Sequence, residues 1–224
     1  MPACPETVDK ASGLSHGLHC ANRGAYRAQT ARGEAKLIAL SFMDTDSASL
    51  EDLAILRSAF ENGTPLGWQA VRAFEEQQGI VLPEPYRTCV AEIADGARGP
   101  PGFGMVKLGE PVERWATDRP ERYLTKPFPL IETWVWEGDE RSDEELRPLL
   151  DAVCDHGSLV LGTDGCAMYW HLIVTGPHRG HVWHITHSGA QPFGAEFGYT
   201  TARSGFAGWV RHWVEGKDWF DACR

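Results

Sequence analysis

The sequence lacks the segments that direct a protein into or through a membrane. No apolar run approaches the roughly 20 residues that a membrane-spanning helix needs. The first ten residues have neither the basic start nor the apolar stretch of a secretory signal. The first apolar segment, at residues 37–43, comes late and is short. We therefore expect no signal peptide and a cytoplasmic location.

The motifs of common enzyme classes are also missing. The sequence contains no GxSxG, HExxH or GxxxxGK[ST] segment, and no GxGxxG segment after a predicted strand. Its GxG, at residues 102–104, follows two prolines in a glycine-rich segment, which indicates a turn. These absences favour a protein that is not an enzyme and carries no cofactor.

Cysteine is present without the spacing of a metal or redox site. The sequence has six cysteines and no CxxC pair. In a reducing cytosol such cysteines are ordinarily free thiols, often buried as small apolar side chains. The sequence therefore predicts neither disulfides nor a cysteine metal site.

Positive charge is scarce, and the deficit lies in one part of the chain. The 21 basic and 31 acidic residues give a net charge of −10. Residues 44–155 carry a net −12, residues 1–43 a net +2, and residues 156–224 are balanced. Such a field repels nucleic acid and anionic membranes, whose recognition needs basic surfaces. It attracts a basic protein and speeds its association.

Apolar spacing and glycine stops predict an α+β domain over residues 44–224, after a poorly ordered extension over residues 1–43. Three helices are predicted first: one capped by Ser49, one opened by Thr64–Pro65, and one begun by Pro83. They end at glycines 63, 79 and 96. Strands are predicted at residues 105–108, 159–161, 168–174 and 181–186, and a closing helix is capped by Ser204. This order favours a mainly antiparallel sheet flanked by helices.

Four of the nine histidines recur at intervals of three: His178, His181, His184 and His187. On a helix they would align as metal ligands, but the Gly-Pro before them and the Val-Trp among them indicate a hairpin and a strand. A strand would turn His181 and His187 to one face and His184 to the other. The series then does not converge on one ion, although two members could meet His171 or Cys166. We expect no metal site.

Two tryptophans, Trp134 and Trp136, precede the densest acidic run. The carboxylates of that run are Glu137, Asp139, Glu140, Asp143, Glu144 and Glu145. Exposed aromatic rings beside carboxylates make good anchors for a partner protein. The alternatives are that the rings cover the hydrophobic core and that the acidic run is a solvated loop.

Several segments, in this order and spacing, resemble the SUKH superfamily, which includes the fungal SMI/KNR-type cell-wall regulators and many bacterial immunity proteins. The matching segments are residues 68–87, 95–102, 126–130, Trp134, 157–165, 176–183 and 206–213. The resemblance covers residues 64–215. It implies an α+β binding module whose bacterial members neutralise polymorphic toxins, often nucleases, by direct contact.

The resemblance and the charge together predict a cytoplasmic immunity protein that binds a basic cognate toxin. The predicted toxin-binding residues are the two tryptophans and the six carboxylates named above. One alternative is a regulatory interaction scaffold like the eukaryotic relatives. A less favoured alternative is a metal-dependent hydrolase that uses the His-rich hairpin.

Overall fold

The structure, a computed structural model, describes residues 47–110 and 122–222. The extension predicted over residues 1–43 lies outside these ranges. Among the helices that the two ranges contain, none has both the length and the apolar character needed to cross a membrane.

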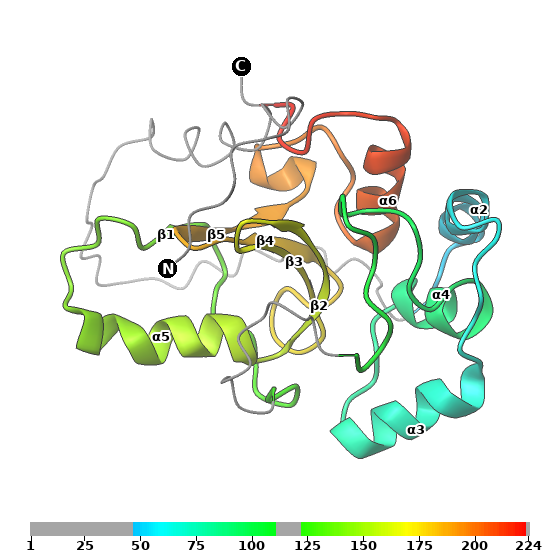
Figure 1. The fold of residues 1–224 in the computed structure, drawn as a ribbon, viewed down its shortest axis with the longest axis horizontal. Helices are drawn as coiled ribbons and strands as arrows, with labels where there is room; N and C mark the ends of the chain where they lie inside the picture. The colour runs from blue at the N-terminus through cyan, green and yellow to red at the C-terminus, as the bar shows by residue number, and fades with distance from the viewer. Residues whose placement is uncertain (1–46, 111–121, 223–224) are drawn as a thin grey trace, which may run out of the picture.

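A five-stranded antiparallel sheet forms the centre of the fold (Figure 1). Its strands are β1 (Trp134–Val135), β2 (Ser158–Gly165), β3 (Met168–Ile173), β4 (Val182–Ile185) and β5 (Gly189–Phe193). The last four pair with their sequence neighbours, and β1 returns to pair with β5, so the order is β1-β5-β4-β3-β2. The expected α+β class and antiparallel sheet are therefore confirmed.

Helices cover both faces of this sheet. They are α2 (Leu50–Ala59), α3 (Trp68–Gln78), α4 (Tyr86–Glu92), α5 (Asp143–Asp155) and α6 (Phe206–Val214), with a 3-10 turn, η1 (Ala195–Phe197). Side chains of α2, α3, α4 and α6 pack with Leu172 of β3 in the larger core cluster. Its strand neighbour Ile173 packs with Val153 of α5 in a second cluster. Because neighbouring residues of a strand point to opposite faces, α5 lies across the sheet from the other helices.

The first predicted helix begins where its cap residue places it. The Ser49 side chain accepts a hydrogen bond from the Asp52 backbone N–H at 3.0 Å, as an N-cap serine does. Helix α3 ends, as predicted, at Gly79, whose φ of 66° favours a residue without a side chain.

Three predicted helix starts are wrong, one of them the Ser204 cap, because helix α6 begins after Gly205 and has no side-chain cap hydrogen bond. Helix α3 begins after Gly67 and not at Thr64–Pro65, because long-range bonds hold that segment extended: Leu66 N–H donates to Val90 O and Asp95 N–H to Thr64 O, each at 2.9 Å. Helix α4 begins at Tyr86 and not at Pro83. A residue before a proline avoids the helical conformation, and residue 84 precedes a proline.

The predicted strand at residues 105–108 is also wrong. Met105 forms isolated bridges with Ala97 and Gly162, but Leu108 donates its N–H to the side chain of Asp95. The Asp95 carboxylate thus accepts the hydrogen bond that a backbone carbonyl of a neighbouring strand would otherwise accept. The strands predicted from residues 159, 168 and 181 exist with shifted ends, and α5, β1 and β5 were not predicted.

A buried carboxylate ties α3 to α4. Glu75 is 6% exposed and accepts hydrogen bonds from Arg87 at 2.7 and 2.8 Å and from the Leu82 N–H at 2.8 Å. Burial alone would raise the pKa of Glu75, but these bonds hold that pKa below its ordinary 4.5. The folded state is therefore stabilised by the charged form of this group.

Replacing this carboxylate gives a first prediction. Glu75→Gln should lower the free energy of unfolding at pH 7 by about 2 kcal/mol, because it removes charge-assisted hydrogen bonds. The loss should shrink as the pH falls below 4.5, where protonation removes the same interaction from the unmodified protein. Urea unfolding at several pH values measures both effects. The control is Glu76→Gln at the exposed neighbouring position, and equal stability of the two variants would contradict the assignment.

Candidate functional site

Strand β1 places Trp134 and Trp136 at the edge of the sheet. Trp134 is opposite Ala190 of β5, and the two indole rings contact each other edge to face at 5.3 Å. Both rings are partly buried and pack against the second core cluster. The Trp136 N–H donates to the backbone oxygen of His187 at 2.7 Å. The rings therefore cover the core, as one of the two alternatives expected, and keep part of their surface exposed.

The loop after β1 contains an ion pair that belongs to the fold. Arg141 donates to both carboxylate oxygens of Asp139, at 2.9 and 2.7 Å, and its guanidinium lies 5.2 Å from the centre of the Trp134 ring. Hydrogen bonds from Arg141 hold the pKa of Asp139 far below its usual value. The charge of Asp139 is thus neutralised by Arg141, and the pair helps to orient the Trp134 ring.

The rest of the acidic run begins helix α5. The Ser142 hydroxyl accepts from the Glu145 N–H at 3.4 Å, and the Glu145 carboxylate accepts from the Ser142 N–H at 3.0 Å, which makes a capping box. These bonds lower the pKa of Glu145. Asp143 and Glu144 complete an acidic first turn, where the helix dipole favours negative charge. Residues 143–145 are therefore part of a helix and not of a loop, and their side chains are exposed.

Four carboxylates of the run are not bound by another side chain that the structure describes. Within the described residues they make no ion pair and no side-chain hydrogen bond, and all four are exposed: Glu137, Glu140, Asp143 and Glu144. Glu137 and Glu140 lie in the loop between β1 and α5, and Asp143 and Glu144 lie in the first turn of α5, at one end of the molecule in Figure 1. The predicted binding residues therefore lie on one continuous segment, from β1 to the first turn of α5, which we call the acidic edge (Trp134, Trp136 and the six carboxylates).

The structure brings two of the four hairpin histidines together, His178 and His181, with ring centres 5.3 Å apart. His184 is 2% exposed, and burial lowers its pKa to about 3, so the ring is neutral. His178 is buried, His181 lies 3.3 Å from the Glu196 carboxylate, and His187 is exposed. In the part of the chain that the structure describes, no three His, Cys, Asp or Glu side chains are grouped as metal ligands.

A serine and a histidine lie within hydrogen-bond distance between β2 and β3. Ser158 Oγ and His171 Nδ1 are 3.0 Å apart, and Arg122 donates to the Cys154 carbonyl at 2.6 Å and to Ser158 Oγ at 3.2 Å. Ser158 and His171 are fully buried, so a substrate cannot reach them. The cluster joins the end of α5 to the sheet and is not a nucleophilic site.

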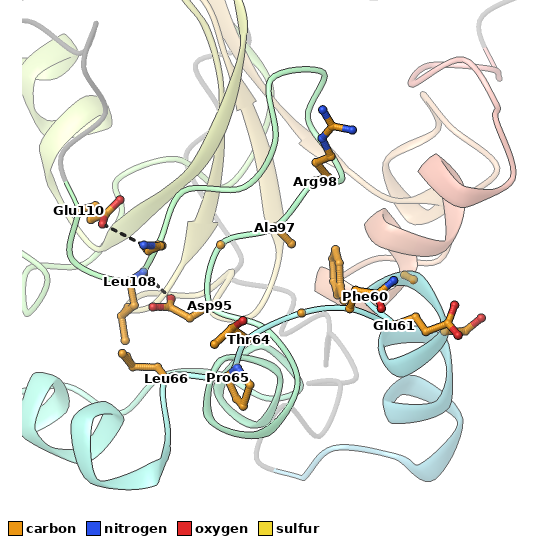
Figure 2. A pocket seen from close by; sticks show the side chains of 16 residues that line it. Phe60, Glu61, Thr64, Pro65, Leu66, Asp95, Ala97, Arg98, Leu108 and Glu110 are labelled. Atoms are coloured by element: carbon orange, nitrogen blue, oxygen red, sulfur yellow. Dashed lines mark hydrogen bonds and ion pairs between the residues drawn. The ribbon is translucent and has the colours of Figure 1, made fainter.

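A groove of about 970 Å³, which the sequence did not reveal, lies between the end of α2 with the segment after it, residues 95–98 and the segment around Leu108 (Figure 2). Its floor holds Asp95, which is 9% exposed and accepts a hydrogen bond from the Leu108 N–H at 2.7 Å. Burial raises the pKa of Asp95 above its usual value. From the sequence alone, Asp95 indicates only the end of a helix.

The capping box gives a second prediction. Ser142→Ala should lower the free energy of unfolding by about 1 kcal/mol, because it removes the acceptor for an orphan N–H at the start of α5. Glu145→Gln should destabilise the protein in the same direction, whereas Glu140→Gln, at an exposed loop position, should leave stability unchanged. Thermal unfolding of the three variants measures this. An effect of Glu140→Gln as large as that of Ser142→Ala would show that the box is not the cause.

Comparisons of the chain with protein-family models, with curated proteins and with solved structures find no match. The comparisons therefore identify no relative of the chain by sequence or by fold. The resemblance to the SUKH superfamily stays a prediction that depends on the segments quoted above.

Proposed function

We propose that the protein is a cytoplasmic immunity protein of the SUKH type that binds and neutralises a cognate toxin through the acidic edge. It acts without catalysis, by occupying the surface that the toxin uses for its own substrate. The observation that carries this proposal is the set of four exposed carboxylates that have no structural partner, next to two aromatic rings on an edge strand.

The chemistry of the acidic edge favours a basic protein partner. Tryptophan rings supply a large apolar contact area, and interface residues of this type carry much of the binding energy. The carboxylates attract a basic surface over a Debye length and speed its association. A nuclease is basic where it holds phosphate, so an acidic inhibitor can cover that surface and exclude the nucleic acid.

Separate parts of the acidic edge have separate tasks. The pair of Asp139 and Arg141 and the capping box of Ser142 and Glu145 hold the backbone in place. A rigid surface loses little conformational entropy on binding, which favours affinity. The exposed carboxylates then contribute charge to the interface without first breaking bonds of their own.

Neutralisation is tested by co-expression. The chain is produced together with the C-terminal domain of a large secreted protein encoded in a neighbouring reading frame, which the proposal requires the genome to contain. We expect cells with both proteins to grow and cells with the domain alone to stop growing. Cells that stop growing in both cases, although both proteins are soluble and present, would contradict the proposal.

The role of the charge gives a third prediction. The double change Glu137→Lys and Glu140→Lys should slow association with the toxin domain about tenfold at low salt and weaken its salt dependence, because steering is lost. Stopped-flow mixing at several ionic strengths measures the rate constants. The matched control, Glu76→Lys with Asp218→Lys, makes the same change in net charge at exposed positions of α3 and the C-terminal segment. Equal rates for the two double variants would exclude a specific role of the acidic edge.

A further inference from the structure

Two histidines connect the tip of the β3–β4 hairpin, residues 174–181, to the 3-10 turn η1. His178 and His181, which we call the histidine pair, lie in the tip with their ring centres 5.3 Å apart, and both rings contact Phe197 of η1. Neither residue belongs to the acidic edge or lines the Asp95 groove. An inference about the pair therefore does not depend on the proposed function.

Contacts with the histidine pair hold η1 against the hairpin tip. None of the three residues of η1 is buried. The Phe197 ring stacks on His178 at 5.6 Å and meets His181 edge to face at 5.7 Å. The Glu196 carboxylate lies 3.3 Å from His181 Nε2. Glycines precede and follow the turn, and glycine changes its backbone conformation more freely than other residues. The position of η1 therefore depends on the state of the two rings.

The surroundings of His178 favour a neutral ring. His178 is 7% exposed, and Trp183 of β4 contacts it edge to face at 5.5 Å. The ring donates a hydrogen bond to the Ile131 backbone, and its Nδ1 is buried without a partner among the described residues. Burial and the neighbouring His181 hold the pKa of His178 below its ordinary 6.5. A proton added at Nδ1 would place a charge where no described atom accepts its hydrogen bond.

Glu196 supplies one negative charge to the two rings. The charges that act on His178 are those of His181 and Glu196, since its neighbours Trp183 and the Ile131 backbone carry none. Burial by itself would raise the pKa of Glu196, but the hydrogen bond from His181 holds it below 4.5. One ionised carboxylate compensates one protonated imidazole. A proton on the second ring therefore leaves like charges close together in a partly dry environment.

The other charged groups near His181 have partners of their own. They line a small cavity beside it and are Asp52, Glu84 and Arg203. Asp52 and Arg203 form an ion pair with each other. Glu84 accepts a hydrogen bond from the Thr88 backbone N–H at 3.1 Å. These groups therefore do not replace the compensation that a second protonated ring would need.

We propose that the histidine pair is an acid-sensitive latch: when both rings carry a proton, η1 and the hairpin tip separate while the sheet stays folded. Separation lets the second charge reach water. The open form binds more protons than the closed form, so acid favours opening. The stabilisation of the closed form is complete above the ordinary histidine pKa of 6.5 and is lost as the pH falls through the lower pKa of His178.

Amide hydrogen–deuterium exchange of the full chain at about pH 7 and about pH 5 tests the latch. After correction for the intrinsic pH dependence of exchange, residues 178–181 and 195–199 should exchange about tenfold faster at the lower pH, as a displacement of about one pKa unit predicts. Residues of β3 should not change. Unchanged exchange in both segments, or an equal increase in β3, would overturn the proposal.

Variants separate the protonation of the pair from its packing. His178→Phe keeps an aromatic ring against Trp183 and Phe197 but cannot be protonated, so it should abolish the acid response. The control is His187→Phe, at an exposed position between β4 and β5, which should retain the response. If His178→Phe does not fold, Glu196→Gln serves, because loss of the compensating carboxylate should move the opening to higher pH. An acid response retained in His178→Phe, or an unchanged midpoint in Glu196→Gln, would contradict the latch.

Discussion

The packing of α5 against the second face of the sheet determines where the acidic edge lies. Val153 of this helix is buried against Trp183 and Ile185, and Trp134 and Trp136 pack on the same cluster. The loop of residues 136–142 connects this edge strand to the first turn of α5. The segment from β1 to the first turn of α5 therefore carries both apolar area, from the two tryptophans, and negative charge.

The same packing explains why the acidic residues differ in their roles. A helix start needs acceptors for its free N–H groups, and Ser142 and Glu145 supply them. The loop before it is fixed by Asp139, which binds Arg141. Exposed positions that neither task uses retain their full charge in solvent. A net charge of −10 is therefore divided between groups that stabilise the fold and groups that are available to a partner.

Local signals in the sequence predicted part of the fold, and long-range bonds decided the rest. The cap at Ser49 and the stop at Gly79 depend on a few neighbouring residues, so both were predictable. Strand β5 contains a glycine and a proline, which weaken a strand prediction, and its pairing with β1 and β4 outweighs them. The groove could not be predicted, because the bond between Asp95 and Leu108 joins residues that no local pattern relates.

Hydrogen–deuterium exchange on the complex with the toxin domain tests the central claim most directly. The backbone amides of residues 134–145 lie at an exposed edge, and a partner that covers the edge slows their exchange with solvent. The account predicts slower exchange in this segment on binding, larger than in the exposed parts of α2 and α6. Unchanged exchange at residues 134–145, with protection confined to another surface, would contradict it.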